Sequence, residues 1–124
     1  MESVEYRTKN ENLRKRMKVF SLDTIRFLNK VSTNDVSRVI KNQLLRSATS
    51  VAANYISACR SRSTPEFISK MGIVAEEADE SLYWMEILEE TQYIDKEWLN
   101  YLKREINEIL AIVVTSIKTA KKQI

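Results

Sequence analysis

The stretch RSATSVAANYISACRSRSTPEF, Arg46–Phe67, contains the clearest boundary between two helices in the chain. In it, Ser63 precedes Glu66 by three residues, which is the spacing of a helix N-terminal capping box. Pro65 suits the first turn of the following helix, because its missing N–H would have no partner there. Before the boundary, 11 of the 18 residues from Arg46 to Ser63 are Ala, Ser, Thr or Cys. The stretch therefore predicts a helix of unusually small and basic residues, followed by a second helix.

The composition of the whole chain favours an all-helical fold. The 124 residues include one Gly and one Pro, whereas a sheet protein needs turn residues at every hairpin. This length fits a single domain with its own core. Cys59 is the only cysteine, so no intrachain disulfide can form. With no apparent signal peptide and no run of 18 apolar residues, the sequence predicts a protein of the reducing cytoplasm without a membrane span.

Helical periodicity predicts four helices within one domain, residues 1–124. Their expected ranges are about 10–31, 35–61, 64–91 and 95–121, with the residues before the first helix left loose. Asn34 or Asp35 can cap the second helix and Asp95 the fourth, by accepting a free backbone N–H. Loops this short force neighbouring helices to be antiparallel, so we expect an up-down-up-down four-helix bundle.

Several helices carry more apolar residues than one core-facing stripe requires. Such surplus favours self-association, although a wide core stripe is the alternative. The candidate oligomer-interface residues are Leu45, Ala52, Ile56, Cys59, Trp84 and Ile87. Asn54 lies close to these apolar positions, so its amide requires a buried hydrogen-bond partner that the sequence does not identify.

The charges are divided unevenly along the chain. Residues 1–62 hold 13 Lys and Arg against 5 Asp and Glu, whereas residues 63–124 hold 7 against 12. This division indicates either contact with a polyanion or charge pairing between helices. Without a base-reading motif, any nucleic-acid binding would be directed to the backbone and sensitive to salt. The candidate nucleic-acid-binding residues are Arg14, Lys15, Arg16, Lys18, Arg38, Lys41, Arg46, Arg60 and Arg62.

Most residue sets that carry enzyme chemistry are missing from the sequence. It has no histidine, and its lone cysteine cannot build a zinc site. One carboxylate cluster, Glu76, Glu77 and Glu80, could hold Mg²⁺. It resembles the first half of the Glu-Glu-x-x-Glu motif of all-helical nucleotide pyrophosphohydrolases, but the second half of that pattern is absent. We therefore predict no enzymatic activity, no metal site and no cofactor, with an Mg²⁺-dependent enzyme as a minor alternative.

The segment from Ser50 to Leu88 resembles a family of small bacterial four-helix-bundle proteins encoded in intervening sequences of large-subunit ribosomal RNA genes. The matching features are a Ser, Ala-Asn, a hydrophobic pair, a basic-Ser junction, Glu-Phe-Ile and a Glu-rich third helix. In this chain they are Ser50, Ala53-Asn54, Tyr55-Ile56, Arg62-Ser63, Glu66-Phe67-Ile68 and Glu77–Trp84. This chain has Ser57-Ala58 and Glu76 at positions where members often carry other residues. A salt bridge between helices two and three in relatives is therefore not carried over.

The resemblance implies a homo-oligomer, most simply a pentameric barrel, without enzymatic activity. The family is similar in fold to the accessory variability determinant proteins of diversity-generating retroelements, in which a basic surface engages nucleic acid and a reverse transcriptase. By analogy, RNA or DNA and a reverse-transcriptase-like protein are possible partners. The expected function is a nucleic-acid-binding oligomer, and the alternative is a protein–protein adaptor or scaffold that uses no nucleic acid.

Overall fold

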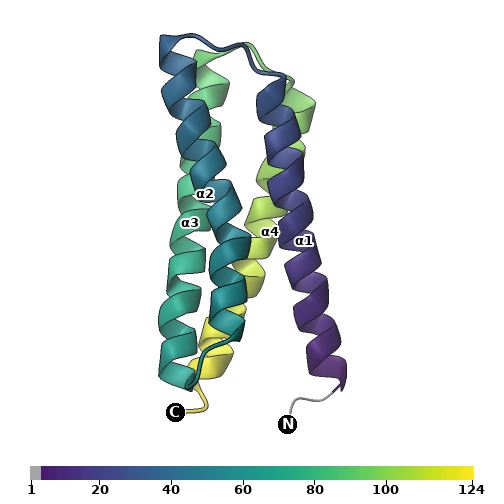
Figure 1. The fold of residues 1–124 in the computed structure, drawn as a ribbon, viewed down its shortest axis with the longest axis vertical. Coiled ribbons are helices and arrows are strands. Elements are labelled where there is room, and N and C mark those ends of the chain that lie inside the picture. Colours follow the sequence, from purple (N-terminus) through teal and green to yellow (C-terminus); the bar gives the residue numbers. More distant parts are fainter. Residues whose placement is uncertain (1–3) are drawn as a thin grey trace.

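The chain folds as an antiparallel four-helix bundle with up-down-up-down connectivity (Figure 1). In this computed structural model the backbone is described for residues 4–124 and the side chains for residues 12–124. The four helices are α1 (Val4–Asn29), α2 (Asp35–Cys59), α3 (Thr64–Thr91) and α4 (Lys96–Lys121). The start of α1, the C-terminus and the α2–α3 connection lie at one end of the bundle, and the other two connections lie at the opposite end.

The helix boundaries agree with the predicted ranges except at the start of the chain. Helix α1 begins at Val4 instead of near residue 10, so the expected loose segment is shorter than predicted. Neither Gly nor Pro occurs in this part of the chain to stop a helix. The third helix begins at Thr64 and ends at Thr91, as the sequence predicts.

Side chains cap the start of α2 and of α3. Asn34 Oδ1 accepts a hydrogen bond from Ser37 N at 2.9 Å, and Ser37 Oγ accepts one from Asn34 N at 2.8 Å. At the start of α3, Ser63 Oγ accepts from Glu66 N at 3.2 Å. The return bond runs from Arg62 N to Glu66 Oε2, at 2.8 Å, one residue earlier than in a standard capping box. The sequence motif therefore marks the helix start correctly, with a shifted return partner.

Helices α2 and α3 pack more extensively than any other pair. Small residues are buried on both helices: Ser47 and Ala48 on α2, and Ala78 and Ser81 on α3, are each 0% exposed. The two buried hydroxyls meet at 3.1 Å between Ser81 Oγ and Ser47 Oγ. Small side chains let the two helix backbones approach closely, which explains why the second helix is rich in Ala and Ser.

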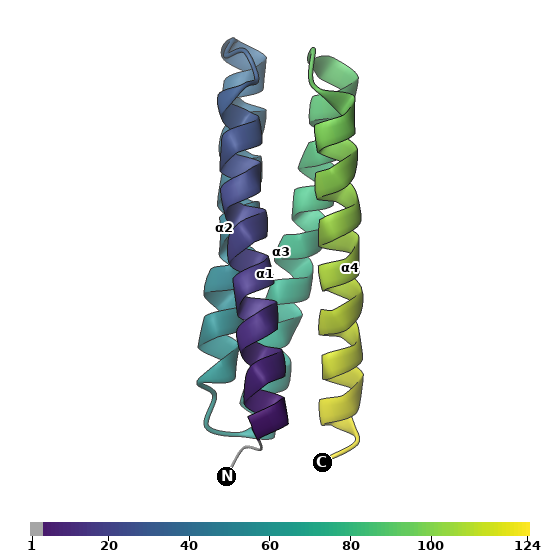
Figure 2. The same cartoon turned by 90° about the vertical axis from the view of Figure 1, so that its right-hand side faces the viewer.

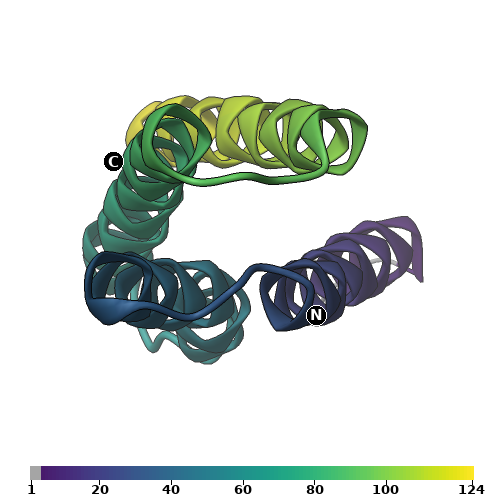
Figure 3. The ribbon, with the colours of Figure 1, turned by 90° about the horizontal axis from the view of Figure 1, so that it is seen from above.

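Helices α1 and α4 form the least extensive of the four contacts. Near the α1–α2 and α3–α4 connections, the ring of Phe27 packs edge-on against Trp98, with centroids 5.6 Å apart. Farther along, polar contacts join the two helices: Tyr101 donates to Asp23 at 3.2 Å, and Arg16 bonds Glu105 of α4 at 3.2 Å. Figures 1 and 3 show α1 diverging from the other helices toward its N-terminus, and Figure 2 shows the ends of α2 and α4 at the same end of the bundle. The bundle is therefore open on one side at the end that carries both termini.

Candidate nucleic-acid interface

Two of the nine predicted nucleic-acid-binding residues instead join helices of the bundle. Arg16 Nη2 donates to Glu105 Oε2 at 3.2 Å and also forms an ion pair with Glu108, which ties α1 to α4. Arg46 Nη1 donates to Glu77 Oε2 at 3.2 Å and also forms an ion pair with Glu80, which ties α2 to α3. These two arginines are therefore better explained as structural residues.

The ion pair of Arg46 and Glu80 shifts the pKa values of both residues, and a tryptophan on α3 contributes to the shift at Glu80. The hydrogen bond to Glu80, followed by the charge of Glu77, raises the pKa of Arg46 above its ordinary value. The same hydrogen bond, helped by one from Trp84 Nε1 at 3.2 Å, lowers the pKa of Glu80 below 4.5. Although no charge pair could be carried over from the family pattern, a salt bridge does join α2 and α3 here.

Lys41 and Arg38 are engaged at the opposite end of the bundle from the chain termini. Lys41 Nζ donates to Val31 O at 2.8 Å and to Thr33 Oγ1 at 2.9 Å. It therefore holds the α1–α2 connection against the first turns of α2. Arg38 Nη1 lies 3.3 Å from Asp35 Oδ1 on the same helix. This second pair is exposed and contributes little to stability.

The other five predicted residues keep exposed side chains. Within residues 12–124 none of them forms an ion pair with another described residue, and all lie in the central turns of α1 or at the end of α2. They are Arg14, Lys15, Lys18, Arg60 and Arg62.

Three lysines that the sequence did not single out for nucleic-acid binding join this group. Lys118, Lys121 and Lys122 occupy the last turn of α4 and the residue after it, and all are exposed. The sequence signal, three lysines among five residues, is visible but is equally explained by the helix dipole. Antiparallel packing brings the end of α4 to the same end of the bundle as the end of α2. We call the eight cations together the basic end: Arg60, Arg62, Lys118, Lys121 and Lys122 at the end itself, and Arg14, Lys15 and Lys18 in the central turns of α1.

Glu66, an acidic residue next to the basic end, has its negative charge compensated by nearby groups. Glu66 lies 3.2 Å from Lys70 Nζ and accepts the Arg62 backbone N–H at 2.8 Å. The Arg62 N–H, followed by the Lys70 hydrogen bond, lowers the pKa of Glu66 below 4.5. Its charge is therefore compensated locally and leaves the arginine side chains available.

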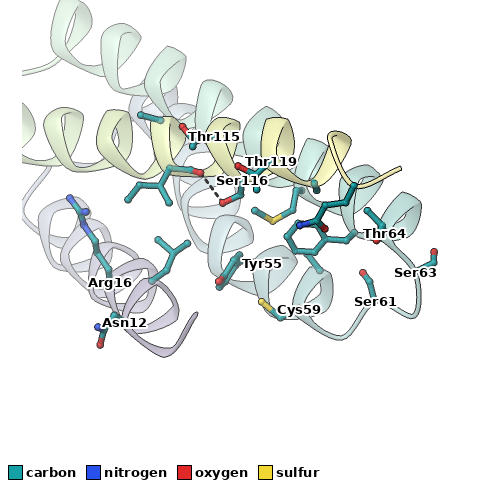
Figure 4. Close-up of a pocket in the computed structure, with 18 of the residues that line it drawn as sticks. Asn12, Arg16, Tyr55, Cys59, Ser61, Ser63, Thr64, Thr115, Ser116 and Thr119 are labelled. Carbon is teal, nitrogen blue, oxygen red and sulfur yellow. Dashed lines mark hydrogen bonds between the residues drawn. The ribbon is translucent and has the colours of Figure 1, made fainter. Parts of the chain in front are cut away.

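A groove of about 1070 Å³ opens beside the basic end, where α1 diverges from α4. Residues from all four helices line it, as Figure 4 shows. Its apolar lining includes Leu13, Tyr55, Ala58, Phe67, Met71 and Ile112. Its polar lining includes Asn12, Ser61, Thr64, Thr115, Ser116, Thr119 and Gln123, together with Arg16 and Arg62. We call this cavity the terminal groove.

The predicted oligomer-interface residues fall on two faces of the bundle. Leu45, 39% exposed, and Cys59, also exposed, lie on α2. Ala52, Trp84 and Ile87 are half-buried and pack against the core of the protomer itself, so their apolar character is partly explained without a partner. Ile56 is half-buried.

Two exposed valines extend the α2–α3 face beyond the predicted set. Val36 and Val39 are 57% and 58% exposed. They lie three turns before Ser47 and two turns before Arg46, both of which contact α3. The start of α2 is held beside the end of α3 by a 3.1 Å bond from Asn34 Nδ2 to Gln92 Oε1. Val36, Val39, Trp84 and Ile87 therefore form what we call the α2–α3 apolar patch.

The acidic cluster does not favour the alternative of a magnesium enzyme. Glu77 and Glu80 are occupied by Arg46, and Glu76 is exposed. Among the described residues, no three acidic or cysteine side chains lie close enough together to hold a metal ion.

The side-chain amide of Asn54 finds its partner on its own helix. Asn54 Nδ2 donates to Ser50 O, one turn earlier, at 2.8 Å. This bond answers the question that the sequence left open, and no other helix is needed to satisfy the donor.

Over the described part of the chain, no helix combines the length and the apolar character required to cross a membrane.

The fold and the comparisons with known proteins define the class of this chain. It is an all-α, up-down four-helix bundle, and the family model described as 23S rRNA-intervening sequence protein matches residues 9–115. The chain therefore belongs to that family. It is similar to a crystal structure of a protein of unknown function from the S23 ribosomal protein family of Bacteroides thetaiotaomicron. The two share 28% identity with a TM-score of 0.79, over 89% of this chain and 98% of that one. A search of curated proteins found no match.

Proposed function

We propose that this protein is a non-enzymatic homo-oligomer that binds the backbone of RNA or DNA. The observation that carries the proposal is the basic end, in which five exposed cations of α4 and the α2–α3 connection lie at one end of the bundle and three more lie in the central turns of α1. Lys and Arg side chains that are free of internal acidic partners can release counterions from phosphates, which is the main source of backbone-directed affinity.

The α2–α3 apolar patch supports the oligomeric part of the proposal. Val36 and Val39 are more than half exposed on a face that also carries Trp84 and Ile87. Leu45 comes one turn after Lys41, which bonds Val31 O just after α1, and Cys59 lines the terminal groove together with Leu13 of α1. Both therefore lie on the α1 side of α2, away from this patch. Two different apolar faces on one protomer suit a head-to-tail contact, which closes into a ring when the rotation between copies allows it. A pentameric ring would repeat each basic end five times and add avidity.

Light scattering on the purified protein, with the 260/280 nm absorbance ratio read on the same peak, tests both parts together. We expect a mass several times that of the protomer and, before nuclease treatment, a raised ratio. Binding of the cleared protein to structured RNA is then measured at about 50 mM and at about 200 mM salt. We expect the affinity to fall by about 10³-fold or more between them. No measurable binding at the lower salt concentration would refute the nucleic-acid proposal.

A protein–protein adaptor is the second candidate function, and the α2–α3 apolar patch is the observation that favours it. Exposed apolar patches mark contact sites for proteins as well as for copies of the same chain. An adaptor keeps its partner after nuclease treatment, whereas a nucleic-acid-bridged complex loses it. A reverse-transcriptase-like protein is one candidate partner, by analogy with the accessory variability determinant proteins. Substituting Val36→Lys and Val39→Lys would release the partner of an adaptor and leave the mass of the protein in light scattering unchanged. A fall in that mass would show instead that the patch joins copies of this chain.

A further inference from the structure

The terminal groove is chemically mixed, which narrows the kind of ligand that it suits. Its floor is apolar and includes Phe67, which is half-buried, and Tyr55, which is 3% exposed. Thr115, Ser116 and Thr119 on α4 contribute hydroxyls to its wall (Figure 4). A helix docked in this groove would place its apolar face against those hydroxyls. A flat ring with polar edges would contact both the floor and the wall.

The groove also lies beside the cations of the basic end. Arg62 belongs to both, because it lines the groove and lies in the α2–α3 connection. Lys118, Lys121 and Lys122 follow directly from the turns of α4 that supply the groove hydroxyls. A ligand with its rings in the groove would therefore have its phosphates within the field of these cations.

We infer that the nucleic acid bound by this protein is single-stranded, with unpaired bases entering the terminal groove and phosphates held by the basic end. The inference rests on the proposed function and specifies its ligand. Proteins that bind single strands combine a positively charged surface for the backbone with apolar and aromatic surfaces for the bases. A duplex hides its base faces in the stack and presents only phosphates and groove edges, so it cannot use the apolar floor.

The number of phosphates on the RNA distinguishes base contacts in the groove from simple electrostatic attraction. A duplex carries twice as many phosphates as a single strand of the same length. A purely electrostatic surface would therefore bind the duplex more tightly. A preference for the single strand requires contacts with the bases.

The experiment compares a single-stranded RNA with a duplex of the same length, at the same salt concentration. We expect the single strand to bind about tenfold more tightly, because each base that packs in the groove adds affinity. Ser116→Phe fills the groove without changing charge, and we expect it to lower single-strand affinity to the level of the duplex. Thr119→Phe is a second filling variant at an exposed groove position.

Val114→Phe is the matched control, because it adds the same ring to α4 at a position that does not line the groove. We expect it to bind like the unchanged protein. Circular dichroism shows whether each variant is folded, so that at least one filling variant can be interpreted.

Equal or tighter binding of the duplex, or unchanged single-strand binding by folded filling variants, would overturn the inference and leave the proposed function standing. No binding of either RNA would refute the proposed function itself. If a filling variant instead changes the oligomer mass in light scattering, the groove is a contact between copies of this chain, and the inference is again wrong.

Discussion

The close contact of α2 and α3 depends on small side chains more than on the hydrogen bond between them, and substitutions at Ser81 separate the two effects. Ser81 Oγ lies 2.8 Å from Glu77 O and 3.1 Å from Ser47 Oγ, whereas Ser47 Oγ also lies 3.3 Å from Leu44 O. In Ser81→Ala, Ser47 can still donate to Leu44 O. No buried donor loses its last partner, so we expect a loss of about 1 kcal/mol in the free energy of unfolding.

Ser81→Leu should cost considerably more. Both serines are 0% exposed, so the larger side chain has no room and must push α2 and α3 apart. Overpacking of about 1–3 kcal/mol adds to the lost hydrogen bond, which gives an expected total of about 3 kcal/mol.

Urea unfolding followed by circular dichroism measures both losses. Protein concentration must be held constant, because oligomer formation would make the midpoint depend on it. A loss for Ser81→Leu no larger than that for Ser81→Ala would refute the close-packing argument. A loss of about 3 kcal/mol for Ser81→Ala would show that the hydroxyl pair itself is essential.

Three further predictions concern the cap, the core and the ion pairs. Asn34→Ala removes the acceptor for Ser37 N, and we expect urea unfolding to show a loss of about 1 kcal/mol in the free energy of unfolding. An unchanged free energy would mean that water replaces the cap fully. Leu102→Ala empties a position that is 0% exposed and should cost about 2–5 kcal/mol in the same assay; a cost below about 1 kcal/mol would contradict its core placement. The folded-state pKa of Glu80 is lowered by its bond to Arg46, so this pair stabilises the protein above the unfolded-state pKa, and the stabilisation is lost as pH falls through the folded-state value. Glu80→Gln should flatten the dependence of the unfolding midpoint on pH in the acidic range, as pH falls below the unfolded-state pKa of a glutamate, and an unchanged slope would contradict that assignment.

The sequence predicted the helices well because their signals are local. Ser63, Pro65 and Glu66 mark the start of α3, and each acts within one turn of its own position. The up-down-up-down order follows from loops too short to permit any other arrangement. The start of α1 was missed because a helix that extends past its apolar stripe leaves no periodic signal.

The candidate site was predicted only in part. Ion pairing between side chains of different helices depends on how the helices pack, and no single segment of the sequence shows it. Arg16 and Arg46 have the same sequence character as Arg14 and Arg60, but only the first two face acidic residues of a neighbouring helix. Lys118 lies in the last turn of its own helix, where the helix dipole equally explains a lysine. Its place near the end of α2 follows from antiparallel packing, which the sequence predicts for helices as wholes and not for single side chains.

The terminal groove could not be predicted from the sequence at all. It exists because α1 diverges from α4 toward its N-terminus. The rings of Phe27 and Trp98 join the two helices near one end, and Arg16 joins them by ion pairs toward the other. A sequence pattern gives the polarity of each residue but not the separation of the two helices.

The salt dependence of RNA binding, measured with and without the lysines at the end of α4, tests the central claim most directly. Lys118→Gln, Lys121→Gln and Lys122→Gln are combined in one variant. The control variant removes the same charge from exposed residues Lys30, Lys96 and Arg104, which lie outside the basic end. For single-stranded RNA, each lost phosphate contact lowers the slope of log affinity against log salt by about 0.7. We predict a slope smaller by about 2 for the lysine variant and unchanged for the control. An equal slope in both variants would contradict the assignment of nucleic-acid binding to the basic end.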